Sequence, residues 1–144
     1  MHEMNADTEN AQFRLFAFLS AMREWENKFA TLFKQEHGGP EAHSDQAEAE
    51  VRPIYEKYLA TVKAERLALS AGYPPKFDPD AEKIVSAELL NTNNVIIEAL
   101  WTHPLVADFT ERHRYTMTKR ADEWRVKKRE LYDFGRNKWI KQTL

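Results

Sequence analysis

The last third of the chain holds two runs of residues in which aromatic or apolar side chains alternate with polar ones. Within residues 109–119, arginines and threonines separate the aromatic and apolar positions, and within residues 124–132 a similar alternation starts at Trp124. A period of two residues is typical of a half-buried β-strand. The polar or small residues at 120–123 suit a turn, so the pattern predicts an antiparallel hairpin and then a short third strand near Trp139.

The turn also predicts which residues face one another across the hairpin. If the two strands close symmetrically on it, the expected cross-strand pairs are Met117 with Val126, Lys119 with Trp124, Tyr115 with Lys128, and His113 with Glu130. One face of the hairpin is then mostly apolar and needs a cover. The opposite face is basic and is the candidate surface for a partner, because arginine side chains suit carboxylate groups. The candidate partner-binding residues are Arg112, Arg114, Arg125, Lys127 and Arg129.

Two helices predicted upstream can cover the apolar face. After a loose leader at residues 1–8, a helix extends to about Gln35, and a second helical region covers residues 44–70 with an interruption at Pro53. In the first helix, apolar and aromatic residues recur at steps of three and four and are expected in the core: Phe13, Leu15, Phe16, Leu19, Met22, Trp25, Phe29, Leu32 and Phe33.

A connector and a further strand pair lie between the helices and the hairpin. Three prolines within residues 73–80 exclude a regular helix or a central strand, and Tyr73 and Phe77 are expected to anchor this connector. Residues 84–90 and 95–101 have the composition of strands and are joined by an asparagine-rich turn. Helices followed by antiparallel strands with short connections predict an α+β fold, and all 144 residues are expected to form a single domain.

Composition excludes several kinds of site. The chain has no cysteine, which excludes disulfides, zinc–thiolate sites and cysteine nucleophiles. The polar N-terminus lacks the apolar core of a signal peptide, and no apolar run approaches the ~20 residues that span a bilayer, so we expect a cytoplasmic protein without a membrane contact. Charge is uneven: from Asp108 onward, 11 Lys and Arg against 6 Asp and Glu give +5, whereas in the preceding 107 residues 10 against 17 give −7. This asymmetry can steer a charged partner.

The strongest catalytic candidate is the pair of His113 and Glu130, with Tyr115 beside it. In the expected register, the carboxylate would hold the imidazole as a base and the tyrosine would donate a proton. A shift of one residue would send the pair to opposite faces, and a plain cross-strand contact explains the same residues. The five histidines show no metal-ligand spacing and no phosphate-binding loop is present, so no metal or cofactor is expected. Nucleic acid is not expected as a partner, because the basic face carries no recognition motif.

Several motifs give the chain a family resemblance. The order of the helices and two hairpins, together with the motifs Tyr115-x-Met117, Glu123-Trp124-Arg125-Val126 and Asn137-Lys138-Trp139, resembles the nuclear transport factor two-like superfamily. The connector Pro74-Pro75-Lys76-Phe77-Asp78-Pro79 narrows the likeness to the immunity proteins of bacterial polymorphic toxin systems. The resemblance covers roughly residues 50–143, and it departs from the family pattern at Ala121-Asp122-Glu123 and at Asn137, where glycine is common.

The resemblance implies a cone-shaped, strongly curved antiparallel sheet packed on the N-terminal helices. It also implies a cytoplasmic bacterial immunity protein that binds and neutralises a cognate toxin domain by occlusion, without catalysis. The basic sheet face is the favoured contact surface, and the acidic helical half is the other candidate. The same superfamily includes isomerases and dehydratases that use the cone pocket, so a small-molecule enzyme is the alternative. Curved sheets of this kind also pair back to back, so a homodimer could compete for the basic face.

Overall fold

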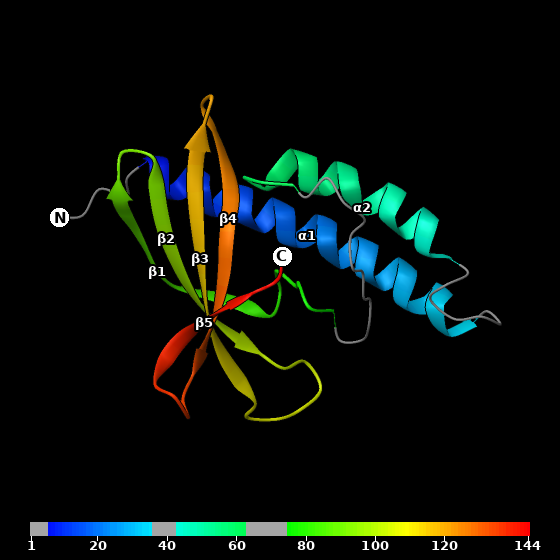
Figure 1. Ribbon diagram of the computed structural model, residues 1–144. Coiled ribbons are helices and arrows are strands. Elements are labelled where there is room, and N and C mark those ends of the chain that lie inside the picture. Colours follow the sequence, from blue (N-terminus) through cyan, green and yellow to red (C-terminus); the bar gives the residue numbers. More distant parts are fainter. Residues whose placement is uncertain (1–5, 36–42, 63–74) are drawn as a thin grey trace.

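Within residues 6–35, 43–62 and 75–144, which the computed structural model describes, two helices precede a five-stranded antiparallel sheet (Figure 1). The helices are α1 (Ala6–Gln35) and α2 (Ser44–Tyr58). The strands are β1 (Glu82–Asn91), β2 (Asn94–Thr102), β3 (Thr110–Arg120), β4 (Glu123–Asp133) and β5 (Lys138–Gln142). Strand order in the sheet follows chain order, and all neighbouring strands are antiparallel. The prediction of an α+β fold with helices before strands is confirmed.

The long helix α1 packs on the sheet with one apolar stripe. Its buried hydrophobic residues recur mostly at steps of three and four: Ala11, Leu15, Phe18, Leu19, Met22, Trp25, Phe29 and Ala30. The prediction that Phe13 belongs to this stripe is wrong, since Phe13 is 81% exposed whereas Phe18 is fully buried. Phe13 lies two residues before the buried Leu15, and two residues correspond to about 200° of helix rotation. The Phe13 side chain therefore points away from the sheet. In the part of the chain that is described, neither helix combines the length and the apolarity that crossing a bilayer requires.

The start of the chain also differs from the prediction. Helix α1 begins at Ala6, so residues 6–8 are helical and do not belong to a leader. Residues 1–5, the side chain of Phe33 and the expected anchor Tyr73 lie outside the described residues.

Helix α2 ends earlier than predicted. It continues through Pro53 and ends at Tyr58, although the apolar pattern of the sequence goes on beyond that point. Residues 63–70 of the predicted helical region lie outside the described residues. Leu59 leaves the helix because its backbone forms a parallel bridge with Val126 of β4, and the N–H of Ala60 donates to the Val126 carbonyl at 2.9 Å. A long-range backbone contact therefore overrides the local helical preference.

The connector before β1 is fastened to α1. Phe77 is 3% exposed and packs edge-on against the Phe18 ring, with the centroids 5.4 Å apart. Its backbone N–H donates to the Glu26 carboxylate at 3.0 Å, and the Arg23 guanidinium contacts Asp78 at 3.1 Å. The prediction that Phe77 anchors the connector is confirmed.

The hairpin of β3 and β4 has the predicted turn. Ala121 and Asp122 have positive φ angles of 50° and 64°, as the two central residues of a type I′ turn do. The pairs next to the turn are those predicted, Lys119 with Trp124 and Met117 with Val126.

Lys127 is an extra residue in β4, and it shifts the pairing of the hairpin beyond it. The pairs predicted there, Tyr115 with Lys128 and His113 with Glu130, are wrong. The observed pairs are Thr116 with Lys128, Tyr115 with Arg129, Arg114 with Glu130, and His113 with Leu131. A β-bulge of this kind reverses the alternation of a strand, so Arg129 lies on the inner face of the sheet and Glu130 on the outer face.

The sheet is strongly twisted. In Figure 1, β4 lies to the right of β2 above the point where the strands cross, and below that point the orange-red segment that joins β4 to β5 lies to the left of the yellow segment. A bulge bends its strand and increases the local right-handed twist. Besides the bulge at Lys127, β1 has two register shifts, one between Ile84 and Ser86 and one between Leu89 and Asn91. These irregularities thus contribute to the twist.

Phe18→Ala tests the orientation of α1, with Phe13→Ala as its matched control. Removing a buried phenylalanine leaves a cavity and lowers the free energy of unfolding by about 3–5 kcal/mol. Removing an exposed one should change it by less than about 0.5 kcal/mol. We expect the denaturant midpoints to separate the two variants clearly. An equal loss of stability in both variants would contradict the orientation of the helix.

Candidate functional site

Four side chains on the outer face of β3, β4 and β5 form an arginine–aromatic cluster, which consists of Arg112, Arg114, Tyr132 and Trp139. The guanidinium carbon of Arg114 lies 4.4 Å from the centre of the Trp139 ring. That of Arg112 lies 4.9 Å from the Tyr132 ring and 5.3 Å from the Trp139 ring. Phe134, which is 69% exposed, packs edge-on against Tyr132 and extends the cluster. Cation–π contacts of this kind hold the arginines in place while leaving N–H groups for a partner.

Glu130 fixes the orientation of Arg114. The Nε and Nη2 atoms of Arg114 donate to the two carboxylate oxygens at 2.9 and 3.1 Å, which makes a bidentate pair. Partial burial raises the pKa of Glu130, but Arg114 and then Lys128 outweigh this effect, so the pKa is lowered overall. Arg112 in turn contacts Glu98 of β2 at 3.5 Å. The outer face therefore presents fixed charges of both signs.

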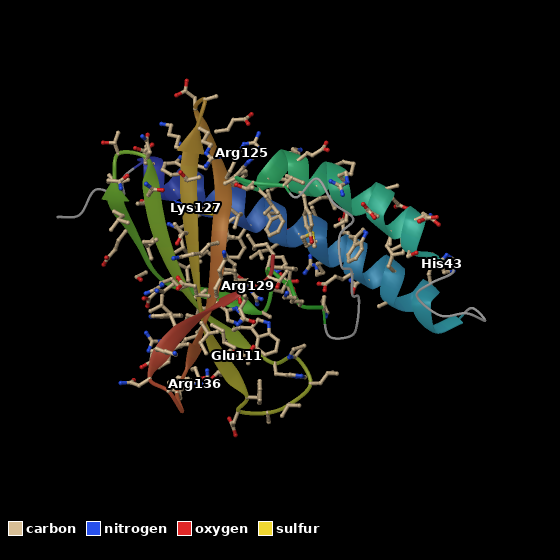
Figure 2. All side chains as sticks on the ribbon, viewed as in Figure 1. His43, Glu111, Arg125, Lys127, Arg129 and Arg136 are labelled. Carbon is tan, nitrogen blue, oxygen red and sulfur yellow. The ribbon has the colours of Figure 1, made fainter. Side chains whose placement is uncertain are left out.

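The other three cations predicted to bind a partner do not join this cluster. Arg125 donates to the carbonyl oxygens of Glu56 at 2.7 Å and Leu59 at 3.2 Å, so it caps the end of α2. Lys127 is exposed at the bulge, and Arg129 is 5% exposed on the inner face. Figure 2 shows these three residues along β4, with Arg129 nearest to the point where the strands cross. The five cations therefore do not share one basic face, because the bulge turns Arg129 to the inner face and Arg125 is bound to the end of α2.

Arg129 is the centre of a second group of charged side chains, the inner group, which lies on the inner face of the sheet. Its Nε donates to the Tyr115 hydroxyl at 3.2 Å, and its guanidinium carbon lies 5.1 Å from the centre of the Phe77 ring. Among the residues placed by the structure, no carboxylate oxygen lies within 4.0 Å of Arg129. Burial raises the pKa of Tyr115, and the charge of Arg129 offsets only part of this effect, so the hydroxyl stays protonated at neutral pH.

His113 lies between two carboxylates, and neither belongs to Glu130. Its Nδ1 is hydrogen-bonded to Glu82 of β1, and its Nε2 lies 3.4 Å from Oε1 of Glu111. The imidazole stacks on Trp101 and is 2% exposed. The catalytic pair proposed from the sequence is therefore not formed, because the bulge turns Glu130 to the outer face.

Two further ionisable groups lie near Arg129. Burial raises the pKa of Glu26, although the N–H of Phe77 and the charges of Lys76 and Arg129 oppose this shift. Lys76 is exposed along part of its length, but its ammonium group is bound to the Thr143 carbonyl at 2.8 Å. Loss of hydration lowers the pKa of Lys76, and repulsion from Arg129 lowers it further.

A cavity of about 260 Å³ opens beside this inner group. Its polar lining comes from the connector and from β2, β3, β4 and β5: Lys76, Trp101, Glu111, His113, Arg129 and Gln142. Within residues 6–35, 43–62 and 75–144, no three histidine, aspartate or glutamate side chains are grouped as metal ligands would be. The lining is rich in hydrogen-bond donors, so it suits a polar or anionic group.

Comparison with known proteins assigns the chain to a family. A family model described as NTF2 fold immunity protein matches residues 10–143, from the second turn of α1 to the residue after β5. The chain belongs to this family. The immunity protein RhsIA of Dickeya dadantii (strain 3937) is 36% identical to it over 132 residues, which are 88% of this chain and 90% of that protein. No solved structure matches the chain. The resemblance seen in the sequence is confirmed.

Sequence reasoning missed several residues that shape the two regions of this immunity protein. The alternation in the last strands marks Tyr132 and Trp139 as strand residues, but it does not show that both meet arginines. Glu82 stands in no motif, and the connector motif that contains Lys76 does not show where its side chain lies. The sheet and the connector bring both residues to the inner group only after folding. The one available signal is the density of arginines beside aromatic residues in the last third of the chain.

Glu26→Gln tests the electrostatics of the inner group of this immunity protein. Because burial raises the pKa of Glu26, the wild type loses stability relative to the variant as the pH rises from the unfolded-state pKa near 4.5 through the folded-state pKa. Glutamine keeps an acceptor for the Phe77 N–H and carries no charge. We expect equal stability below pH 4.5 and a more stable variant at neutral pH, measured by denaturant unfolding at a series of pH values. A wild-type advantage that grows with pH would contradict the direction of the shift.

Proposed function

We propose that this protein binds a cognate toxin domain and neutralises it by occlusion, without catalysing a reaction. The observation that carries the proposal is the match of an immunity-protein family model to residues 10–143, supported by 36% identity to a protein named immunity protein RhsIA. A binder of this kind needs a rigid surface that fits one partner better than others. The five-stranded sheet, packed on α1, is such a surface.

The arginine–aromatic cluster is the proposed contact surface. Tryptophan, tyrosine and arginine are the residues that most often dominate the binding energy of an interface. Both arginines of the cluster are held over the Trp139 ring, and the aromatic residues stand opposite each other on β4 and β5. Side chains that are already fixed lose little conformational entropy on binding. Phe134 adds exposed apolar surface beside them.

The charge of this region favours an acidic surface on the toxin. The chain from Asp108 onward carries a net charge of +5, and guanidinium groups bind carboxylates in a bidentate manner. Opposite charges also raise the rate of encounter. We place this encounter in the cytoplasm. We do not assign nucleic acid to the surface, because Glu98 and Glu130 fix negative charges within it.

A growth experiment tests the immunity function. The toxin domain encoded next to the gene of this protein should stop the growth of a bacterial host, and co-expression of this protein should restore growth. A toxin domain from an unrelated system is the control and should stay toxic, since immunity depends on a specific complex. Cell death despite abundant folded protein would overturn the proposal.

Arg112→Glu and Trp139→Ala test the contact surface. Each removes a central member of the cluster, so we expect the dissociation constant for the purified toxin domain to rise at least about 10-fold, or about 1.4 kcal/mol, by titration calorimetry. Lys83→Glu is the matched control, because it reverses one exposed cation on the edge strand β1. Unchanged affinity in both cluster variants would place the contact elsewhere, such as on the acidic helices.

A second copy of the chain is the competing occupant of the same face. Sedimentation of the protein alone at several concentrations measures such a homodimer. If it uses the arginine–aromatic cluster, Arg112→Glu should dissociate it and Lys83→Glu should not. Addition of the toxin domain should then convert the dimer to a complex with the toxin.

A further inference from the structure

Arg129 is a buried cation without a carboxylate beside it. It is 5% exposed, and no carboxylate oxygen of the described residues lies within 4.0 Å. Its Nε is bound to the Tyr115 hydroxyl, and its Nη2 has a weak contact of 3.4 Å with Nδ1 of His113. Its Nη1 has no hydrogen bond within the placed part of the chain. Burying a charge without a counter-charge costs free energy. An anion bound beside the guanidinium would therefore stabilise it.

Two other donors border the same cavity. Lys76 forms no ion pair with a described residue, and its ammonium group donates to the Thr143 carbonyl. The Trp101 ring also lines the cavity, and its buried indole N–H has no hydrogen-bond partner among the described residues. Lys76 and Arg129 lie close enough for each to feel the charge of the other. Two cations and the ring of Trp101 therefore line the cavity.

Glu111 lines the cavity, and Glu82 and Glu26 lie near it, but the contacts of all three carboxylates are with groups other than Arg129. Glu82 is hydrogen-bonded to Nδ1 of His113, and Glu111 lies 3.4 Å from Nε2 of the same ring. Glu26 accepts the backbone N–H of Phe77, and burial disfavours its charged form. None of the three contacts the buried guanidinium directly, so its charge is left for another anion.

We propose that the cavity is a carboxylate-binding site in which Arg129 and Lys76 hold the anion beside the Trp101 ring. The guanidinium suits a carboxylate because its N–H groups form a planar fork. The cavity has a volume of about 260 Å³. Pockets for drug-sized ligands have volumes of about 300–1,000 Å³, so this smaller cavity fits a short carboxylate. That group is either a small free acid or the end of an acidic side chain of the toxin.

The indole N–H resonance of Trp101 reports on this site. The full chain, labelled with ¹⁵N, is titrated with sodium propionate, which resembles a glutamate side chain, at an ionic strength held constant with sodium chloride. We expect a saturable shift of this resonance, which Trp101→Phe identifies by its loss. Propionamide has the same shape without the charge and should cause no saturable shift. The same response to propionamide or to chloride alone would overturn the proposal.

Arg129→Gln removes the guanidinium and should weaken propionate binding at least about 10-fold, because a hydrogen bond between charged groups is lost. Lys127→Gln is the matched control, since it removes a cation from the same strand outside the cavity. If Arg129→Gln does not fold, Lys76→Met takes its place, because the Lys76 side chain is exposed and its replacement disturbs the core less. Wild-type affinity in the folded cavity variant would contradict the site.

Repeating the titration on the toxin complex distinguishes the two sources of the carboxylate. If an acidic side chain of the toxin fills the cavity, the complex should not respond to propionate, and Arg129→Gln should also weaken toxin binding. If the complex responds as the free protein does, the ligand is a small free acid. Only this second titration rests on the proposed function, because the first one needs no toxin.

Discussion

The β-bulge at Lys127 is the constraint on which both faces of the sheet depend. With regular pairing, Lys128 would face Tyr115 in the interior of the molecule. The extra residue turns Lys128 outward and Arg129 inward, where the guanidinium binds the Tyr115 hydroxyl and stacks on Phe77. Arginine is better suited to this position, because its guanidinium is more weakly hydrated than an ammonium group and stacks on aromatic rings. One inserted residue thus divides the cations of the hairpin between an inner and an outer set.

The same bulge builds the outer face. It places Glu130 opposite Arg114, and the next strand places Trp139 opposite Tyr132. The backbone register therefore decides which arginine meets which ring. The helices hold this sheet in place through polar contacts as well as apolar ones, since Arg14 of α1 donates to the carbonyls of Trp124 and Lys57 at 3.1 and 2.6 Å. A surface fixed in this way suits an immunity protein, whose specificity comes from the placement of side chains.

Local signals in the sequence predicted the parts of the fold that local chemistry decides. The turn at Ala121 and Asp122 determines the cross-strand pairs next to it, and these pairs were predicted correctly. The apolar periodicity of the first part of the chain predicted α1. The bulge escaped prediction because residues 127–129 are three consecutive cations, and no periodicity shows which of them is the extra one. The end of α2 depends on a backbone bridge to a strand far along the chain, which propensity cannot reveal. The outer arginines could therefore be predicted as a surface, whereas the inner position of Arg129 could not.

Cross-strand nuclear Overhauser effects measure the register of the β3–β4 hairpin directly. Opposite residues of antiparallel strands bring backbone protons close together, so each pairing leaves its own set of contacts. We predict contacts that join Tyr115 with Arg129 and Arg114 with Glu130. Contacts that join Tyr115 with Lys128 and His113 with Glu130 would show a hairpin without the bulge, and they would contradict the division of the cations between the two faces.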